Sequence, residues 1–385
     1  MTNRERLLAI LEGRSPDRIP WIPRLGIWYN AHRRLGSVPD RFKGMTLREV
    51  ERTLRLGTPA RGARVFRTEY RNMDVIVRDE GRNTITEYIT PKGTVRTVKS
   101  VSEEQARLGF ETKIITEYPL KSAEDYDVWM YVVENTVFVP TYEEYEAFDR
   151  EIGEDGLPMV DAGDCPFHQW LNTLAGYDSG YIHLIVEFRD RVEALLKLVT
   201  EKDREMWKIV AESPSKLILH GSHLSTQLTP PKYFDRYITS YYQEFSELLH
   251  ANGKSLTMHA DNDTSRILPH LKAAGYDMLE CFATAPMAKV TLQEAREVLG
   301  TSVIIWGGVP SVLLEEYFPE EEFETYMVDV FRSVAPGDAF ILGISDNAMP
   351  NSMISRVERI SDMVEEYGHY PISLDAQQAS PSEKG

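Results

Sequence analysis

From residue 157 onward, short apolar segments alternate with longer segments of helical periodicity. The apolar segments have the length and composition of buried strands, and they read PMVDAG, KLILHGS, SLTMHAD, DMLECFA, VIIWGGV and AFILGIS. The predicted helices that follow them span residues 190–211, 230–251, 264–274, 291–298, 320–334 and 351–367. Repeated strand–helix units predict a parallel sheet with right-handed crossovers. Six such units in a row favour a closed (β/α)8 TIM barrel over an open sheet.

The first part of the chain departs from this alternation. Residues 2–13 are predicted to form an N-terminal amphipathic helix that begins with a capping motif. Residues 64–118 are rich in β-forming residues, with a turn signal at 91–93, and are predicted to form an inserted antiparallel β-hairpin layer. We expect a single barrel domain over residues 1–373, followed by a disordered polar tail over 374–385.

Composition and charge restrict the class of protein. Of the 385 residues, 42% are hydrophobic and 27% are charged, which is the balance of a globular protein with a large core. The formal net charge of −17 argues against nucleic acid as a partner, because phosphate binding relies on a basic face. No apolar run approaches the ~20 residues that cross a bilayer, and the charged N-terminus does not resemble a signal peptide. With only Cys165 and Cys281, we expect a cytoplasmic protein without disulfides and without a membrane partner.

Polar residues gather where the predicted strands end. The carboxyl ends of all barrel strands meet at one rim, which carries the active site in this architecture. His259 and Asp261 follow the strand SLTM and can face the same way, since alternate residues of a strand share a face. Glu280, with Cys281 beside it, ends the next strand, and Asp346 ends a later one. A histidine and carboxylates from separate strand ends can form a zinc site with an open position for substrate.

This interpretation has a structural alternative. His259 can be a hydrogen-bonded rim residue, the acids can be helix caps, and Cys281 can be a small buried hydrophobe. At another strand end, His220 and His223 are candidates for acid–base catalysis or substrate contact, and ordinary loop histidines are the alternative.

Candidate substrate contacts come from an acid and several aromatic residues. Asp161 ends the first of the regular strands. Trp28, Tyr29, Trp170 and Trp306 would form a flat aromatic wall if they reached the rim, although aromatic residues also fill cores. The chain has no glycine-rich dinucleotide fingerprint after a strand, no P-loop and no nucleophile elbow, so those chemistries fit poorly.

Several motifs together resemble the uroporphyrinogen decarboxylase superfamily. They are the opening RERLLAILEGRSPDRIP, the segment TPKGTVRTV, the strand end LTMHAD, and then AAGYDMLECFATAP, IIWGGVPS and FILGISDNAMP. The resemblance runs from about residue 4 to residue 368 and rests on the order and spacing of these motifs. It implies the (β/α)8 barrel and one of two chemistries, which are metal-free decarboxylation and methyl transfer that depends on zinc and a corrinoid.

The residues at the matching positions favour the methyltransferase branch. The decarboxylases carry an arginine-rich segment near the N-terminus, whereas the matching stretch WIPRLGIWYNAHRR surrounds Arg24 with aromatic and apolar residues. Methyltransferases that act on coenzyme M hold zinc with a His-x-Cys pair, a later cysteine and sometimes a glutamate. His259 matches the histidine and Glu280 the glutamate, while Asp261 stands in place of the first cysteine and Asp346 or Asn347 lies near the second.

The resemblance therefore implies a zinc- and corrinoid-dependent O-demethylase. A His/carboxylate set leaves zinc a harder Lewis acid than a thiolate set, suited to a leaving oxygen. The enzyme would move a methyl group from a small methoxylated, aromatic donor to a corrinoid on a separate protein. Zinc is expected at His259, Glu280 and Asp346, with Asp261 or Cys281 as substitutes. The alternatives are a metal-free decarboxylase, a methylcorrinoid-to-thiol or -folate methyltransferase, and a non-catalytic barrel; the inserted hairpin offers a surface for a homodimer.

Overall fold

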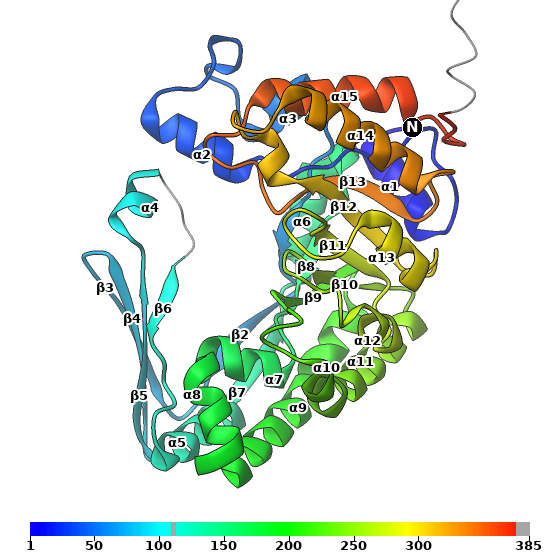
Figure 1. The fold of residues 1–385 in the computed structure, drawn as a ribbon. Coiled ribbons are helices and arrows are strands. Elements are labelled where there is room, and N and C mark those ends of the chain that lie inside the picture. The colour runs from blue at the N-terminus through cyan, green and yellow to red at the C-terminus, as the bar shows by residue number, and fades with distance from the viewer. Residues whose placement is uncertain (109–112, 375–385) are drawn as a thin grey trace, which may run out of the picture.

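The structure, a computed structural model, describes residues 1–108 and 113–374 (Figure 1). Its centre is a parallel sheet of seven strands in the order β1-β8-β9-β10-β11-β12-β13. These strands are β1 (Arg61–Ala63), β8 (Met159–Asp161), β9 (Leu217–Ser222), β10 (Ser255–His259), β11 (Met278–Phe282), β12 (Ile304–Pro310) and β13 (Phe340–Ser345). The six strands predicted from residue 157 onward are therefore confirmed. Of the tail predicted to be disordered, residues 375–385 lie outside the described ranges.

Helices connect the parallel strands and cover one face of the sheet (Figure 1). They are α9 (Arg189–Glu212), α10 (Pro231–Phe234), α11 (Ser240–Ala251), α12 (Leu268–Ala273), α13 (Leu292–Leu299), α14 (Glu320–Val334) and α15 (Ile354–Tyr367). The helix predicted over 230–251 is interrupted by a π-helical turn, Asp235–Thr239. The helix predicted over 264–274 begins only at Leu268, with Pro269 in its first turn, a position that proline favours.

The N-terminal part of the chain adds further helices. α1 (Asn3–Leu11) begins as predicted, because the Thr2 hydroxyl accepts the N–H of Glu5 while the Glu5 carboxylate accepts the N–H of Thr2. The others are α2 (Gly26–Leu35), α3 (Leu47–Thr53), α4 (Glu103–Leu108), α5 (Ala123–Glu134), α6 (Tyr142–Ile152), α7 (Pro166–Gln169) and α8 (Tyr177–Ile182). None of the helices in the described ranges combines the length and the apolar character that a membrane crossing requires.

The β-rich stretch predicted over 64–118 contains strands of two antiparallel sheets. One sheet has four strands, which are β3 (Asp74–Glu80), β4 (Asn83–Thr90), β5 (Gly93–Ser100) and β6 (Ile114–Glu117). The other pairs β2 (Phe66–Tyr70) with β7 (Thr136–Pro140). The predicted turn at 91–93 joins β4 to β5. In Figure 1 the four-stranded sheet stands apart from the parallel sheet, on the left, while α4 lies against α2.

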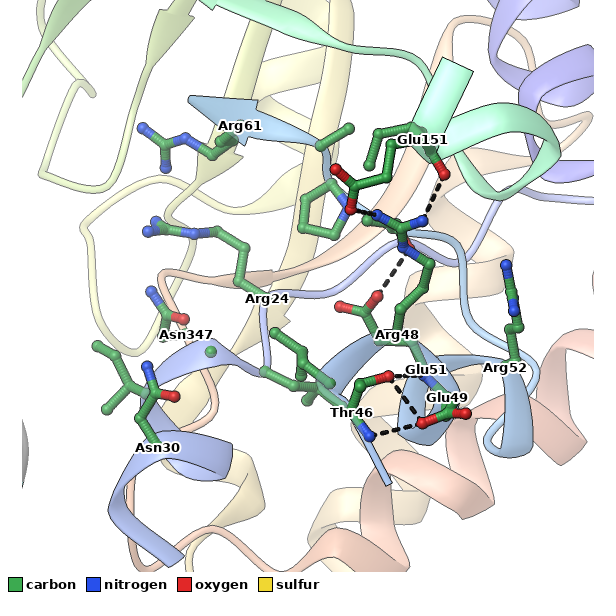
Figure 2. A pocket seen from close by; sticks show the side chains of 18 of the residues that line it. Arg24, Asn30, Thr46, Arg48, Glu49, Glu51, Arg52, Arg61, Glu151 and Asn347 are labelled. Carbon is green, nitrogen blue, oxygen red and sulfur yellow. Dashed lines mark hydrogen bonds and ion pairs between the residues drawn. The ribbon is translucent and has the colours of Figure 1, made fainter. Parts of the chain in front are cut away.

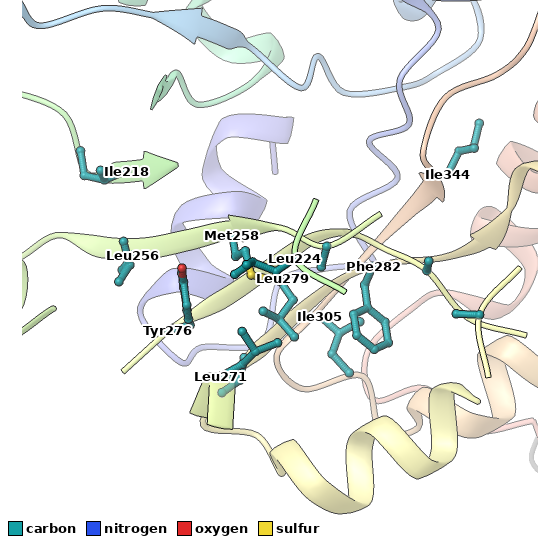
Figure 3. Close-up of a cluster of buried hydrophobic side chains, with 14 of the residues drawn as sticks. Ile218, Leu224, Leu256, Met258, Leu271, Tyr276, Leu279, Phe282, Ile305 and Ile344 are labelled. Carbon is teal, nitrogen blue, oxygen red and sulfur yellow. The ribbon is translucent and has the colours of Figure 1, made fainter. Parts of the chain in front are cut away.

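Alternate residues of the parallel strands pack on opposite faces of the sheet. Ile218, Leu256, Leu279 and Ile305 join the large core beneath the covering helices (Figure 3). The strand residues between them form an inner cluster, closed by residues of α1; its members include Leu7, Ile10, Leu217, Leu219, Met278, Ile304, Trp306 and Ile341. Both faces of the sheet are thus apolar, as expected for a parallel sheet. Polar chemistry is left to the strand ends.

The segment around Trp21 continues the hydrogen bonding of the sheet beyond β13. Trp21 forms a parallel bridge with Leu342, and the N–H of Leu342 donates to the carbonyl of Pro20 at 2.9 Å. On its other side, the carbonyl of Trp21 accepts the N–H of Gly57 at 2.9 Å, shortly before β1 begins. This segment therefore lies between the first and last strands of the sheet.

Candidate active site

His259 and Glu280 lie side by side at the carboxyl ends of neighbouring strands. The parallel pairing of β10 with β11 places these two residues opposite each other. Both side chains are buried, and His259 Nδ1 lies 2.6 Å from Glu280 Oε2. Because an ionised carboxylate only accepts, Nδ1–H is the donor, and the lone pair of Nε2 is left to bind a ligand.

Further side chains surround the Nε2 side of His259. Nε2 lies 3.4 Å from Asp346 Oδ1 and 3.5 Å from Asp261 Oδ2. The ligand atoms of His259, Cys281 and Asp346 lie within 4.8 Å of one another, and so do those of His223, His259 and Asp261. The structure thus brings together the residues that the sequence assigned to one metal site. We refer to them as the His259 cluster, which consists of His259, Asp261, Glu280, Cys281 and Asp346.

Cys281 reaches the cluster through a local irregularity of β11. Its φ of 55° lies in the left-handed region, and the pairing with β12 shifts register between Leu279 and Phe282. Consecutive strand residues normally point to opposite faces, yet Cys281 Sγ lies 3.1 Å from Glu280 Oε1. Burial, and then the Glu280 charge, raise the pKa of the Cys281 thiol well above its usual range. The thiol is therefore protonated at neutral pH.

Two arginines accompany the carboxylates of the cluster. Arg24, just before α2, forms an ion pair with Asp346. Arg61, on β1, places Nη1 3.5 Å from Glu280 Oε1 and 3.5 Å from His259 Nδ1. Burial alone would raise the pKa of Glu280, but Arg61 and His259 outweigh it and hold this pKa well below the usual carboxyl range. Glu280 is therefore a buried anion.

His223 extends the cluster toward solvent. It follows β9, its Nδ1 lies 2.8 Å from Asp261 Oδ2, and its ring centroid lies 5.3 Å from that of His259. The hydrogen bond to Asp261 raises the pKa of His223. Burial alone would raise the pKa of Asp261, but the two histidines lower it. The second oxygen of Asp261, Oδ1, is buried and has no hydrogen-bond partner in the described part of the chain.

The donor set of the cluster fits zinc. An imidazole nitrogen, a thiol sulfur and carboxylate oxygens are zinc ligands, and a cation would satisfy the unpartnered Asp261 oxygen. The arginines oppose a cation. However, the three carboxylates and an ionised Cys281 would carry four negative charges. Two guanidiniums and one divalent ion would carry four positive charges, so the site with its metal would be neutral. Glu280, expected to be a ligand, instead lies on the Nδ1 side of His259, where a carboxylate orients a metal-binding imidazole.

A cavity of about 760 Å³ lies beside the cluster (Figure 2). Arg24 and Arg61 line it and also pair with the acids of the cluster, so they form the wall between the two. Apolar residues line other parts of the cavity, and they are Leu25, Ile27, Leu47, Leu108, Phe148 and Ile152. The volume is within the range of small-molecule sites. A small molecule in this cavity would meet the two arginines before the cluster.

Comparison of the sequence with protein families identifies a relationship. The model of the family described as Uroporphyrinogen decarboxylase (URO-D) matches residues 175–367, about half of the chain. The chain belongs to the uroporphyrinogen decarboxylase family. The match spans β9 to β13 and therefore includes every residue of the His259 cluster. No curated protein matches the sequence.

Solved structures add a likeness in fold. A methyltransferase from Methanosarcina mazei is similar over 95% of this chain and 99% of its own, with a TM-score of 0.60 and 14% identity. A ribulose-1,5-bisphosphate carboxylase/oxygenase from Pyrococcus horikoshii OT3 is similar over 65% of this chain and 49% of its own, with a TM-score of 0.31 and 11% identity. This uroporphyrinogen decarboxylase family member thus shares the fold of the methyltransferase along nearly its whole length.

His220 was a candidate for catalysis together with His223, but its side chain lies away from the His259 cluster. It is fully buried beneath α11, with Nδ1 3.1 Å from the Tyr242 hydroxyl and Nε2 3.4 Å from the Tyr241 hydroxyl. Burial lowers the pKa of His220 to about 4. The catalytic role predicted for His220 is therefore wrong, because its side chain faces the helices rather than the strand ends.

The prediction that four aromatic residues form a wall at the rim is also wrong. Trp306 belongs to the inner core cluster, where its Nε1–H donates to the carbonyl of Ile22 at 3.0 Å. Trp28, Tyr29 and Trp170 are buried in the large core. None of these four aromatic residues lines the cavity beside the His259 cluster. Their apolar surface is used in packing, which is the commoner use of such residues.

Two residues remain to be placed, Asp161, which the sequence singled out, and Arg61, which it did not. Asp161 is exposed at the end of β8 and accepts the N–H of Gly163 at 3.1 Å; its contact with substrate stays a prediction. Arg61 was not identified from the sequence, although it contacts the cluster. Its strand, β1, has three residues, which is too short to show an apolar pattern, so no strand-end signal marked it.

Proposed function

We propose that this family member is a zinc-dependent methyltransferase, which takes a methyl group from a small methoxylated aromatic donor and passes it to a corrinoid on a separate protein. The proposal rests on the convergence of His259, Cys281 and Asp346 at the strand ends. Asp261 lies beside them, with Oδ2 3.5 Å from His259 Nε2 and with a buried Oδ1 that has no partner among the described residues. The fold shared with a methyltransferase supports the same reading.

We also infer that the parallel sheet closes into a (β/α)8 barrel. Trp21 pairs with Leu342 of β13 on one side, and its carbonyl accepts the N–H of Gly57 on the other. An eighth, very short strand at Trp21 would therefore join β13 to β1. Arg24 lies three residues after Trp21 and Arg61 is the first residue of β1, so closure accounts for their contacts with acids of β11 and β13.

In this proposal each residue of the cluster has a defined task. His259, Cys281 and Asp346 hold the metal, and Asp261 lies within reach as a further ligand. Zinc, when bound, supplies Lewis acidity at the leaving oxygen. Glu280 accepts the Nδ1–H of His259 and so fixes the tautomer that presents Nε2.

His223 is the residue proposed to move the proton. Its side chain is half exposed, and Asp261 holds Nδ1 at 2.8 Å, which leaves Nε2 toward the open side of the cluster. The donor oxygen gains an electron pair when the reduced corrinoid takes its methyl carbon, and the proton of His223 neutralises it. The corrinoid protein would dock at the same edge, and the net charge of −17 suits a partner with a basic docking face.

Metal content is the first test of this proposal. Protein purified without chelators is expected to contain about one zinc per chain, and His259→Ala protein none, as measured by mass spectrometry of the elements. His250→Ala, an exposed histidine paired with Asp277, is the matched control and should retain zinc. Zinc-loaded protein should then methylate a reduced corrinoid from at least one methoxyarene, followed by the corrinoid's visible absorption. Wild-type protein that binds no zinc, or is inert toward every donor, would contradict the proposal.

A metal-free decarboxylase is the second candidate, and Arg24 and Arg61 favour it. Two guanidiniums beside the cluster could hold carboxylates of a polyacid instead of opposing a metal. This candidate predicts protein without zinc that releases carbon dioxide from a polycarboxylate substrate at a rate unchanged by chelators. The metal analysis described above therefore separates the two candidates.

A further inference from the structure

One acidic residue in the wall of the cavity beside the His259 cluster has no task in the proposed methyl transfer. Glu51, on α3, lines this cavity, and only 2% of the residue is exposed. The Thr58 hydroxyl donates to Glu51 Oε2 at 2.6 Å. Within residues 1–108 and 113–374, Glu51 Oε1 has no hydrogen-bond partner and the carboxyl forms no ion pair. A buried carboxyl oxygen without a partner is costly, so a ligand group that bonds to it would be favoured.

The two other glutamates that line the cavity already have partners. The Glu49 carboxylate accepts from the N–H and from the hydroxyl of Thr46, as part of the cap of α3. The Glu151 carboxylate accepts from Nη2 of Arg48 at 2.7 Å. Among the acids that line the cavity, Glu51 is therefore the one with an oxygen left for a ligand.

The surroundings of Glu51 favour a neutral hydroxyl as the group that it binds. Burial, opposed by the bond from Thr58, raises the pKa of Glu51 to about 7, so near neutral pH the carboxyl exists both with and without its proton. A hydroxyl fits both forms, because it can donate to a carboxylate and accept from a carboxylic acid. An ammonium group fits the ionised form alone, and the guanidiniums of Arg24 and Arg61 in the same cavity would repel it.

We propose that Glu51 binds a hydroxyl group of the methyl donor and so selects a methoxylated phenol. This inference rests on the proposed methyl transfer and specifies its substrate class. Figure 2 shows the Glu51 side chain apart from Arg24 and Arg61, whose guanidiniums point away from it. A phenol anchored at Glu51 directs its opposite end toward these two arginines, which adjoin the His259 cluster. The ring then packs against the apolar side chains that line the cavity.

Binding measurements with matched probes test this role of Glu51. The probes are ortho- and para-methoxyphenol and the corresponding methoxytoluenes, in which a methyl group of similar size replaces the hydroxyl. Zinc-loaded wild-type protein is expected to bind at least one of the phenols about tenfold more tightly than its methoxytoluene, measured by calorimetry. Glu51→Met should abolish this preference, whereas Glu51→Gln, whose amide can still bond to a hydroxyl, should retain part of it. Glu244→Met, at an exposed glutamate of α11, is the matched control and should keep the full preference.

Two results would overturn the inference. The first is that neither phenol binds wild-type protein more tightly than its methoxytoluene does, which includes no binding of any probe. The second is a preference that survives in Glu51→Met protein. The first result needs no variant, so it decides the question even if Glu51→Met protein does not fold.

A second set of probes separates this inference from the proposed function. The cresols and the matching xylenes repeat the comparison of hydroxyl with methyl but carry no methoxy group. A Glu51-dependent preference for a cresol, in protein that transfers no methyl group, would retain the hydroxyl site and reject the methyltransferase. Methyl transfer that is equally fast from the methoxytoluenes and the methoxyphenols would retain the methyltransferase and reject the selection by Glu51.

Discussion

His259 and Glu280 face each other across two neighbouring strands, with Nδ1 and Oε2 2.6 Å apart. Both side chains are buried, so water does not compete for this hydrogen bond. Glu280 Oε1 is approached by Cys281 Sγ at 3.1 Å and by Arg61 Nη1 at 3.5 Å, which fixes the carboxylate from its other side. The imidazole is thereby oriented with Nε2 toward Asp346, where the proposed metal would bind.

Glu280→Gln should weaken zinc binding without removing a ligand. The amide keeps the shape of the side chain and can still accept from Nδ1–H of His259, but it lacks the charge that raises the basicity of the imidazole. Loss of such an orienting carboxylate costs about 10–100-fold in metal affinity. Competition with a chromophoric chelator measures the change. Glu244→Gln, at an exposed glutamate paired with Arg204, is the control, and equal affinities in the two variants would reject the orienting role.

Cys281→Ser should remove sulfur from the metal site. Cobalt(II) in place of zinc reports on thiolate ligands through a sulfur-to-cobalt charge-transfer band, so wild-type protein is expected to show this band. Cys281→Ser protein should bind cobalt without it, because Sγ lies within 4.8 Å of ligand atoms of His259 and Asp346. Cys165→Ser, at the second buried cysteine, should keep the band. Its absence from the wild-type spectrum would show that Cys281 is only a buried neighbour of the metal.

Arg24→Gln should strengthen zinc binding. Arg24 pairs with Asp346 and places Nη1 3.6 Å from Cys281 Sγ, so its charge occupies the position that a cation needs. Removing that competing charge is expected to tighten zinc binding about tenfold, or ~1.4 kcal/mol. Titration with zinc against a chelator measures the change, and Arg67→Gln controls for the lost net charge. Weaker binding in Arg24→Gln would mean instead that the guanidinium holds Asp346 in place for the metal.

The regular half of the fold could be predicted from the sequence because its strands are buried on both faces. Strands such as β11 and β13 are buried throughout and are mostly apolar until their last residues, so they stand out from the amphipathic helices between them. Their ends were equally clear, which is why His259, Glu280 and Asp346 were correctly expected to meet. The direction of each side chain was not predictable in the same way. The bulge that brings Cys281 beside Glu280 has no sequence signature.

The residues that were misplaced or missed carry no local sequence signal for the direction or contacts of their side chains. His220 and Trp306 sit in strands whose two faces are both buried, so polarity or size alone could not show which way they point. His220 satisfies its ring nitrogens with tyrosines of α11, which are distant in sequence. Arg61 belongs to a strand of three residues in a segment without a repeating pattern, and only tertiary contacts reveal it.

The burial of His220 should make the protein less stable in mild acid. Its pKa is lowered from 6.5 to about 4, because burial disfavours the charged ring. Above pH ~6.5 the ring is neutral in both states, so it adds no pH dependence. Between pH ~6.5 and ~4 the unfolded chain binds the proton and the folded chain does not, so the free energy of unfolding falls as the pH falls.

Urea denaturation of wild-type and His220→Gln protein at pH ~7.5 and ~5 tests this effect of His220. The wild-type protein should lose ~2 kcal/mol more stability between these two conditions than the variant does. The glutamine can still bond to the Tyr241 and Tyr242 hydroxyls but does not titrate, and every other titrating group is common to both proteins. One such group is Asp203, whose pKa burial raises to about 7; its contribution, opposite in sign, therefore cancels in the comparison. Equal losses in the two proteins would show that His220 takes up its proton while the protein remains folded.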